Sequence, residues 1–354
     1  MKAVLYDPVE ENFLRFLRSY LGDETLDYRV RPRRFAQGMF SDVRCFTLNG
    51  GPKGWTAPLV LRMLPFDADP EQPSVETAVH NGLARVGVPT QVVLLSHDRV
   101  EELGRMFIVM ELRPGRPSLK GVRWDVFARE LPKLLLSWPA AVAKIARELH
   151  SCPASSVLDE AKAVGIKQSK LAVERHLLFV EDRFSRLGGQ GTAPALEWLR
   201  DHLPAVPERP SVLHGDLWPA NVLRHRGKLT GLVDWERAAI GDPALDIGFA
   251  KVGLSLLPAP VQVPTPIRQG INAAGRSMAD RLEEQYNRQS PLSPERVRYY
   301  EALRCAVELA IVASRRASDE QGFARSGWYH GQDALTRHFG ETTGIPMPRL
   351  DPSP

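Results

Sequence analysis

The sequence predicts an α+β protein with two lobes, a small β-rich N-terminal lobe and a larger helical C-terminal lobe. Its 354 residues exceed what one hydrophobic core usually organises, and about 150 residues per domain gives two domains. From Arg34 to Leu112 short strand-like runs dominate, whereas beyond Leu112 long segments have helical periodicity. We therefore assign residues 1–112 to the N-terminal lobe and residues 113–354 to the C-terminal lobe.

A helix is predicted to precede the strands of the first lobe. The segment DPVEENFLRFLRSYLG has Asp7 as a candidate N-cap, Pro8 at the first helical position and Gly22 as a stop. Its apolar residues fall on one helical face, so we expect that face to pack against the rest of the lobe.

The remainder of the N-terminal lobe combines strands with one helix. Short runs rich in β-branched and aromatic residues predict strands at residues 42–48, 58–64, 90–96 and 105–112. Between them, the segment PSVETAVHNGLARVG predicts a helix that Gly87 and Pro89 end. This order of strands, one helix and further strands is typical of a small α+β lobe.

The C-terminal lobe is predicted to be mostly helical. Helical periodicity is clearest at residues 140–151, 195–203 and 295–316. The segment LLPAPVQVPTPIRQ, residues 256–269, contains four prolines and predicts an extended loop, because proline disrupts helix interiors.

Composition excludes several classes of protein. Hydrophobic residues at 43% and charged residues at 25% describe a soluble globular chain. The net charge of +4 comes without a dense block of Lys and Arg, which argues against a nucleic-acid partner. No stretch approaches the about 18 apolar residues of a membrane span, and no signal-peptide core is present near the start. The sequence gives no indication of the oligomeric state.

The three cysteines indicate a reducing compartment. Cys45, Cys152 and Cys305 are widely spaced and form no CxxC motif. This pattern fits neither a disulfide framework nor a zinc site, and it predicts a cytoplasmic location.

Three oxygen-bearing side chains stand close together in the sequence. The segment HGDLWPAN, residues 214–221, places Asp216 and Asn221 five positions apart, and the predicted strand KLTGLV, residues 228–233, leads into Asp234. Oxygen ligands suit a hard cation, and magnesium is typically held by one or two protein groups together with substrate phosphates. The spacing of Asp216 and Asn221 matches the catalytic loop of kinases, whose aspartate accepts a hydroxyl proton and whose asparagine holds metal. We therefore expect a magnesium site and a proton acceptor.

Over about residues 34–250 the sequence resembles the family of aminoglycoside and macrolide phosphotransferases and choline kinases. HGDLWPAN and GLVDWERAAIGDPALDIG carry the strongest resemblance. In the N-terminal lobe, QGMFSD is similar to the family's phosphate-covering loop, LVLRM to its phosphate-pairing strand, and FIVMELRPG to its hinge between lobes. The resemblance implies a two-lobed protein-kinase-like fold that transfers the terminal phosphoryl group of ATP or GTP to a hydroxyl group of a small molecule.

The resemblance also implies roles for residues of the catalytic loop. Asp216 would be the catalytic base, with Asn221 and Asp234 as the ligands of Mg²⁺. Asp246 is similar to the family's buried aspartate, which braces the catalytic loop through its backbone amides. We expect His214 to anchor this loop rather than to carry protons.

A second group of residues would contact the nucleotide and make the N-terminal lobe a nucleotide-binding lobe. The main chain of the hinge would supply a donor and an acceptor to the base, and the other members would surround the phosphates. By the resemblance, the group comprises Gly38, Ser41, Arg62, Glu76, Glu111 and Arg113.

The sequence departs from related patterns at two places. Arg62 stands where the family often has lysine, and its planar fork can grip phosphate oxygens and Glu76 with a different geometry. Gly215 stands where protein kinases place arginine, and Asp246 follows Asp234 by only twelve positions. Because this leaves little room for a peptide-binding segment, a small-molecule acceptor is favoured.

Two functions other than phosphoryl transfer are also compatible with these residues. A metal-dependent hydrolase would use His214, Asp216, Asp234 and Asp242, although such sites usually need several histidines. A nucleotide-binding regulator without catalysis is the stronger rival, since Arg62 could mark a weakened phosphate grip. Retention of Asp216, Asn221 and Asp234 together favours catalysis.

The acceptor is expected to contact residues 251–354. This segment has eleven acidic and thirteen basic residues, a balance that does not favour polycationic aminoglycosides. Aromatic side chains there would suit an apolar or ring-shaped alcohol if they line the cleft, although a place in the core is equally compatible with their sequence: Tyr299, Tyr300, Phe323, Trp328 and Tyr329. We predict neutral or singly charged hydroxyl compounds as the better acceptors.

Overall fold

The computed structural model describes residues 8–34, 41–117, 124–186, 191–256, 265–317 and 331–348. The chain divides into two compact units, each built from separate stretches of sequence. The first unit comprises residues 1–121, 155–168 and 220–236, and the second comprises residues 122–154, 169–219 and 237–354. The predicted single division between residues 112 and 113 stays a prediction.

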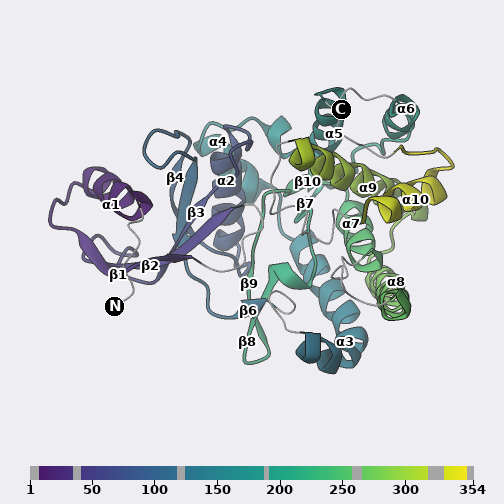
Figure 1. Cartoon of the computed structure of the whole chain (residues 1–354), viewed down its shortest axis with the longest axis horizontal. Helices are drawn as coiled ribbons and strands as arrows, with labels where there is room; N and C mark the ends of the chain where they lie inside the picture. The colour runs from purple at the N-terminus through teal and green to yellow at the C-terminus, as the bar shows by residue number, and fades with distance from the viewer. Residues whose placement is uncertain are drawn as a thin grey trace. The chain divides into compact units, whose positions relative to one another are not determined.

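The first unit contains a five-stranded antiparallel sheet with the order β1-β2-β3-β5-β4 (Figure 1). Its strands are β1 (Asp27–Arg34), β2 (Asp42–Asn49), β3 (Leu59–Met63), β4 (Val93–His97) and β5 (Phe107–Glu111). The four strands predicted from the sequence are β2 to β5. All five residues of the central β3, LVLRM, are buried, and Arg62 is the one charged residue among them.

Strand β1 was not predicted, and its composition explains why. Its sequence DYRVRPRR carries four arginines and a proline, and Pro32 is its one buried residue. Because β1 is an edge strand with exposed side chains, it lacks the alternation of apolar and polar residues that marks a half-buried strand. Arginine and proline on an edge also discourage pairing with another chain.

Helix α1 (Pro8–Leu21) lies beside β1 (Figure 1) and completes the core of the sheet. Its buried Phe13 packs edge to face against Phe46 of β2 and Phe107 of β5, with ring centroids 5.2 and 5.8 Å apart. Edge-to-face pairs of this kind are favoured by the ring quadrupoles. The prediction of a helix that starts at Pro8 and packs one apolar face is confirmed, although its proposed cap Asp7 lies outside the described residues.

The first unit also contains a pair of helices and a second, smaller sheet. Helix α2 (Gln72–Arg85), predicted at residues 73–87, packs against α4 (Ser155–Ala163). A second sheet has the order β6-β8-β9, formed by β6 (Arg116–Pro117), β8 (Val222–His225) and β9 (Lys228–Leu232). The β8–β9 connection places Arg226 and Gly227 at φ 49° and 79°, the left-handed pair that a tight two-residue hairpin requires.

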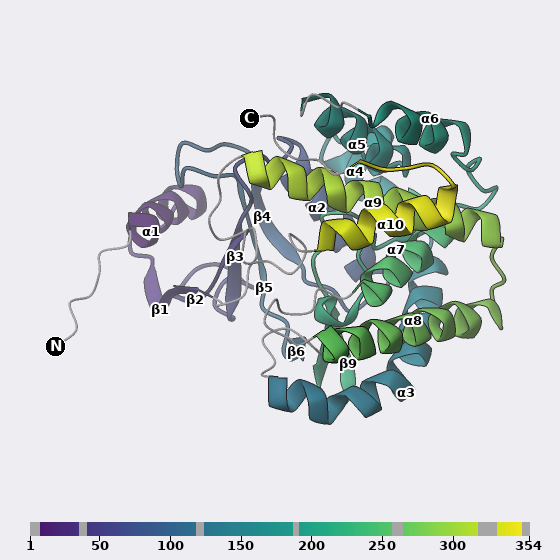
Figure 2. The same ribbon diagram turned by 45° about the vertical axis from the view of Figure 1, so that its right-hand side comes forward.

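The second unit is mostly helical (Figure 2). Helix α9 lies against α7 and α10, and α8 lies against α3 and α7. The helices are α3 (Trp124–His150), α5 (Glu174–Arg186), α6 (Ala193–Asp201), α7 (Ala244–Ser255), α8 (Thr265–Asn287), α9 (Pro294–Ala317) and α10 (Gln332–Thr343). A short antiparallel pair, β7 (Ser211–Leu213) and β10 (Ala239–Gly241), leads into and out of the catalytic motif.

The predicted loop at residues 256–269 is wrong in its last part. Thr265–Gln269 form the first turns of α8, whereas residues 257–264 lie outside the described residues. Pro266 does not prevent this start, because the first turn of a helix has no internal partner for its N–H groups. Among the described helices, none has the length and the apolar character that crossing a membrane requires.

Candidate active site

The catalytic loop begins where β7 ends, at Leu213, and its backbone depends on a glycine. Gly215 has φ 73°, and a Cβ at this position would overlap the carbonyl oxygen of Arg237. Both the left-handed conformation and the close approach exclude a side chain here. The sequence therefore needs glycine where protein kinases have arginine, because the chain that follows β9 passes too close.

A buried aspartate fixes the backbone of this loop. Asp246, near the start of α7, accepts hydrogen bonds from the amides of His214 at 2.9 Å and Gly215 at 2.7 Å, and its Oδ2 lies 2.9 Å from Nε2 of His150. Burial alone raises the pKa of the Asp246 carboxyl, but the hydrogen bond to His150 and the neighbouring charges outweigh it and lower the pKa. The predicted brace is confirmed.

Asp216 projects from the braced loop toward a cation. Its Oδ1 lies 2.8 Å from the guanidinium Nη2 of Arg304, on α9. Burial raises the pKa of the Asp216 carboxyl, but Arg304 and Arg237 outweigh burial and bring the pKa below its ordinary value. The carboxylate is therefore ionised at neutral pH, as a proton acceptor must be. His214 is fully buried and its Nδ1 accepts the Asp216 amide at 3.3 Å, which agrees with an anchoring role.

In the first unit, the β8–β9 hairpin brings the two predicted metal ligands to one end. A short 3₁₀ turn, Pro219–Asn221, leads into β8, and the carbonyl oxygen of Asn221 accepts the amide of Val233 at 3.0 Å. The next residue after Val233 is Asp234, with φ 71°. An aspartate tolerates this left-handed conformation better than most residues, and such strained positions cluster at functional sites.

These two residues fit magnesium by their chemistry. An amide oxygen and a carboxylate oxygen are hard ligands, and Mg²⁺ usually keeps places for phosphates and waters beside one or two protein groups. Asn221 is buried, whereas the Asp234 side chain is 37% exposed and can meet a ligand. Across the described part of the chain, no three His, Cys, Asp or Glu side chains gather as a further metal cluster.

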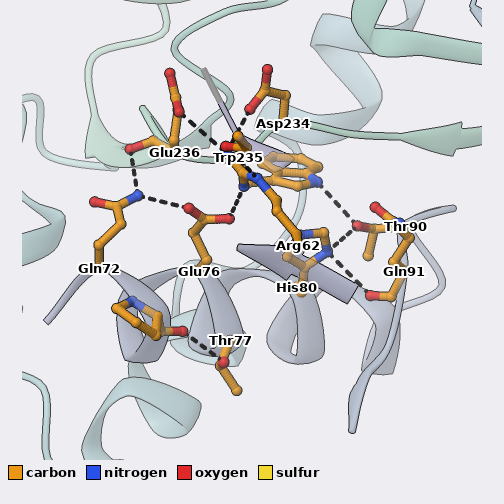
Figure 3. A network of polar contacts seen from close by, with 12 residues as sticks. Arg62, Gln72, Glu76, Thr77, His80, Thr90, Gln91, Asp234, Trp235 and Glu236 are labelled. Atoms are coloured by element: carbon orange, nitrogen blue, oxygen red, sulfur yellow. Dashed lines mark hydrogen bonds and ion pairs between the residues drawn. The ribbon is translucent and has the colours of Figure 1, made fainter. Parts of the chain in front are cut away.

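Asp234 is held in place by the tryptophan that follows it. Trp235 is buried, and its indole N–H is shared between the hydroxyl oxygen of Thr90 at 3.0 Å and the carbonyl oxygen of Leu232 at 3.1 Å. Thr90 in turn lies 2.8 Å from Nδ1 of His80, on α2 (Figure 3). This packing ties the backbone of Asp234 to the helix that carries Glu76.

Arg62 joins the predicted nucleotide residues to this end of the hairpin (Figure 3). Its Nη1 bonds Glu76, and its Nη2 lies 3.2 Å from both Oδ1 of Asp234 and Oε2 of Glu236. Its Nε donates to the hydroxyl of Ser41 at 3.3 Å. Burial opposes the charge of Arg62, but the carboxylates outweigh it and raise the pKa of the guanidinium, so Arg62 is a permanent cation.

Gln72 completes this cluster by fixing the two glutamates. Its amide Nε2 donates to Oε1 of Glu76 at 2.9 Å and to the backbone carbonyl of Glu236 at 3.2 Å. The structure thus brings together Ser41, Arg62, Glu76 and Asp234. Gly38, the remaining predicted residue of the phosphate-covering loop, lies outside the described residues.

The predicted hinge follows the end of β5. The amide of Glu111 donates to the carbonyl oxygen of Val92 at 2.9 Å, so this amide is already bonded within the protein. If the hinge binds a nucleotide base as predicted, Glu111 would contribute its carbonyl group and Arg113 its amide. The guanidinium of Arg113 donates to the carbonyl oxygen of Thr90 at 2.6 Å, which fixes this residue beside the sheet.

Sequence reasoning missed the residues behind Asp216. Arg304 and Glu308 lie one turn apart on α9 and pair at 2.9 Å, and Glu308 also pairs with Arg237 at 2.7 Å. Arg304 is separated from Asp216 by 88 positions, so no local motif links them. The available signal was the presence of two charged residues, four positions apart, within the apolar run ALRCAVELAIVA.

Two other sequence interpretations are settled by burial and bonding. Tyr299 and Tyr300 are core residues, each 2% exposed, so they do not line an acceptor cleft. The other predicted aromatic residues, Phe323, Trp328 and Tyr329, lie outside the described residues. Asp242, considered for a hydrolase, accepts the Ala244 amide at 3.0 Å and pairs with Arg296, so it stabilises the start of α7.

The sequence matches a family model and a curated relative. The model of the phosphotransferase enzyme family matches residues 35–302. The mouse (Mus musculus) protein acyl-CoA dehydrogenase family member 10 is 25% identical over 185 residues, which cover 49% of this chain and 16% of that protein. This chain therefore spans less than a fifth of the length of that relative.

Solved structures share the fold at low sequence identity. A putative aminoglycoside phosphotransferase from Ralstonia eutropha JMP134 is 17% identical with a TM-score of 0.58, over 96% of this chain and 99% of that one. A thermostable mutant of the aminoglycoside phosphotransferase APH(4)-Ia, in ternary complex with ADP and hygromycin B, is 18% identical with a TM-score of 0.57, over 92% of this chain and 98% of that one. These likenesses confirm the predicted two-lobed protein-kinase-like fold.

The family match confirms the resemblance drawn from the motifs. The match extends from the residues just before the phosphate-covering motif into α9, and thus includes Arg62, Asp216, Asn221 and Asp234. Since it covers well over half of the chain, this protein belongs to the phosphotransferase enzyme family.

Proposed function

We propose that this protein transfers the terminal phosphoryl group of ATP or GTP to a hydroxyl group of a small molecule in a magnesium-dependent reaction. The observation that carries the proposal is the Asp216 carboxylate of the second unit, held by Arg304 on a loop that Asp246 fixes, while the first unit presents the oxygen-bearing side chains of Asn221 and Asp234. Five positions of chain join Asp216 to Asn221. Membership of the phosphotransferase enzyme family supports the same reaction.

In this proposal Asp216 accepts the proton of the acceptor hydroxyl. As the acceptor oxygen bonds to the terminal phosphorus, the bond from that phosphorus to the bridging oxygen breaks, and the nucleoside diphosphate leaves. Asp216 orients the attacking hydroxyl because its own loop is fixed by Asp246. Positioning and neutralisation of charge carry most of the catalysis in phosphoryl transfer, since little covalent chemistry falls to the protein.

The nucleotide would be held by residues of the first unit. Arg62 would steady the phosphates, with its orientation set by Glu76, and the Glu111 carbonyl with the Arg113 amide would bind the base. Asn221 and Asp234 would hold Mg²⁺, which supplies positive charge beside the phosphate oxygens when it is bound. The structure of APH(4)-Ia with ADP and hygromycin B is a fold relative that binds a nucleotide, and thus supports a nucleotide donor.

The acceptor is proposed to be a neutral or singly charged hydroxyl compound, such as a sugar, a macrolide or an amino alcohol. Three carboxylates in the described C-terminal helices are already paired: Glu283 and Glu301 with Lys251, and Glu308 with Arg237 and Arg304. A polycationic aminoglycoside would have to compete with these side chains for each carboxylate. Because Tyr299 and Tyr300 are buried in the core, the proposal rests on the balance of charge in this segment.

The proposed location is the cytoplasm, and no nucleic-acid or membrane partner is proposed. Cys45, Cys152 and Cys305 are all unpaired, as a reducing compartment requires. Cys305 is buried.

A substrate panel tests the proposed function. Purified protein is incubated with Mg²⁺ and either ATP or GTP, together with erythromycin, glucose, choline, kanamycin or hygromycin B, and phosphorylated product is measured by mass spectrometry. We expect product with at least one of the first three compounds, and lower kcat/KM with kanamycin and hygromycin B. Efficient turnover of the aminoglycosides alone would overturn the acceptor proposal while leaving the kinase proposal intact.

The same panel separates an enzyme from a regulator. A nucleotide-binding regulator would bind ATP or GTP but consume neither in the presence of any hydroxyl compound. The matched control is Asp216→Asn, which keeps the size of the side chain and removes its charge. Product formed equally by this variant would show that the transfer does not use Asp216.

A further inference from the structure

Arg304 contacts the catalytic loop at two points. Its Nη2 lies 2.8 Å from Oδ1 of Asp216, and its Nη1 donates to the carbonyl oxygen of Gly215 at 3.3 Å. Arg304 also pairs with Glu308, one helical turn along α9, at 2.9 Å. One guanidinium thus bonds the side chain of the predicted base and the backbone beside it. Guanidinium groups suit this task because their donors form a rigid planar fork.

The contact is made from the interior of the second unit. The side chain of Arg304 is 6% exposed and its guanidinium lies over the ring of Phe249, 5.2 Å from the centroid. The side chain of Asp216, by contrast, is 20% exposed. Arg304 therefore approaches the carboxylate from the buried side, and Asp216 keeps contact with solvent.

The cluster around Arg304 alternates in sign. Asp216 pairs with Arg304, Arg304 with Glu308, and Glu308 with Arg237 at 2.7 Å. Taking an arginine out of water is costly, and a buried ion pair often stabilises a fold no better than apolar side chains of the same size. The brace from Asp246 already fixes the loop backbone. The brace acts on backbone amides, whereas Arg304 contacts the side chain of Asp216.

We propose that Arg304 is a positioning residue that fixes the Asp216 carboxylate for proton acceptance, with Glu308 and Arg237 holding the Arg304 guanidinium in place. This inference rests on the proposed phosphoryl transfer. Arg304 acts through Asp216 and does not itself react. Its loss should therefore slow turnover at saturating substrate and leave nucleotide binding intact.

The first test is the kinetic effect of Arg304→Gln with MgATP and the panel acceptor that the parent phosphorylates fastest. We expect kcat to fall by about 10- to 100-fold, since small misplacements of a catalytic group have effects of this size. KM for MgATP should stay within about twofold, because an interaction used only in the transition state lowers kcat without raising KM. Arg304→Lys should recover part of the loss, since lysine supplies the charge without the fork.

A matched control distinguishes positioning from support of α9. Arg296 lies two turns before Arg304 on the same helix and also pairs with a buried aspartate, Asp242. Arg296→Gln removes the same charge and an ion pair from α9 without touching Asp216. We expect its kcat to stay near that of the parent even where its melting temperature drops. Equal losses of kcat in both variants would assign Arg304 a structural part only.

A double-mutant cycle decides whether Arg304 acts through Asp216. If it does, Asp216→Asn combined with Arg304→Gln should turn over no more slowly than Asp216→Asn alone, because residues that act as a unit are non-additive. Multiplicative losses would overturn the inference. A parent protein that phosphorylates no acceptor would defeat the proposed function and this inference with it, whereas an active parent with an unaffected Arg304→Gln variant would defeat this inference alone.

Discussion

Two arginines each hold one of the predicted active-site aspartates, but their surroundings differ in charge. Arg62 in the first unit pairs with three carboxylates, those of Glu76, Asp234 and Glu236. Arg304 in the second unit pairs with Asp216 and Glu308, and Glu308 is shared with a second arginine, Arg237. The first cluster therefore carries excess negative charge, whereas the second is balanced.

The difference in net charge indicates which kind of group each cluster can accommodate. Excess negative charge in a partly buried site favours a cation, and oxygen ligands select magnesium. A balanced cluster does not favour an added cation. It instead fixes the orientation and the ionised state of the Asp216 carboxylate. The Arg62 cluster is thus suited to receive a cation, and the Arg304 cluster fixes the side chain of the predicted base.

The largest effect should come from Asp216, the proposed base. Asp216→Asn should lower kcat by roughly 10²- to 10⁴-fold, the usual contribution of a positioned general base. The nucleotide affinity should change little, since Asp216 acts on the acceptor. Steady-state kinetics and isothermal titration with MgATP measure the two quantities. Turnover close to that of the parent would remove Asp216 from this role and break the contrast between the clusters.

The next effect should come from Asp234, the proposed metal ligand in the Arg62 cluster. Asp234→Asn should remove the magnesium dependence of nucleotide binding, because in the proposed site this carboxylate would hold the metal. ATP affinity is compared with Mg²⁺ and with EDTA for parent and variant. We expect a clear difference for the parent and the same weak affinity in both buffers for the variant. A variant that still responds to Mg²⁺ would place the metal elsewhere.

A smaller effect is expected from Arg62, and it depends on the replacement. Arg62→Ala should weaken ATP binding by about tenfold, the value of one lost charge-assisted contact of about 1.4 kcal/mol. Arg62→Lys should lie between this variant and the parent, because one ammonium group cannot reproduce the fork that reaches Ser41, Glu76 and Asp234 together. Fluorescence titration with a nucleotide analogue measures the series. Parent-like binding by Arg62→Ala would show that Arg62 does not steady the phosphates.

Features that are close together in the sequence could be predicted without the structure. Asp246, whose hydrogen bonds to the loop amides confirm the predicted brace, lies in one of the two motifs that also carry the predicted Asp216, Asn221 and Asp234. The helix that begins at Pro8 has a start signal and a stop signal in its own sequence. In each case the information is local, and tertiary structure reinforces it.

Features that depend on distant contacts could not be predicted. Arg304 meets Asp216 across 88 positions, and the packing that buries Tyr299 and Tyr300 is decided by neighbouring helices. Strand β1 gains its conformation by pairing with β2, although its own arginines and proline do not favour a strand. The start of α8 was missed because proline was treated as a helix breaker at a position where it is tolerated.

The smallest predicted effect is a change of stability with pH that belongs to the balanced cluster. Arg304 and Arg237 lower the pKa of Asp216 in the folded protein against the effect of burial, relative to the ordinary value of 3.8. A carboxylate with a lowered folded pKa stabilises the fold fully above its unfolded pKa, and this contribution is lost as the pH falls through the folded pKa. The melting temperature of the parent should therefore exceed that of Asp216→Asn by a constant amount above about pH 5. The difference should shrink as the pH falls below 3.8, where the parent also loses the ion pair with Arg304. Differential scanning calorimetry across this range measures both proteins, with Asp182→Asn, which removes an exposed ion pair with Arg186, as the control that should follow the parent. A difference between parent and Asp216→Asn that grows on acidification would reverse the sign and show that Arg304 does not stabilise the charged form of Asp216.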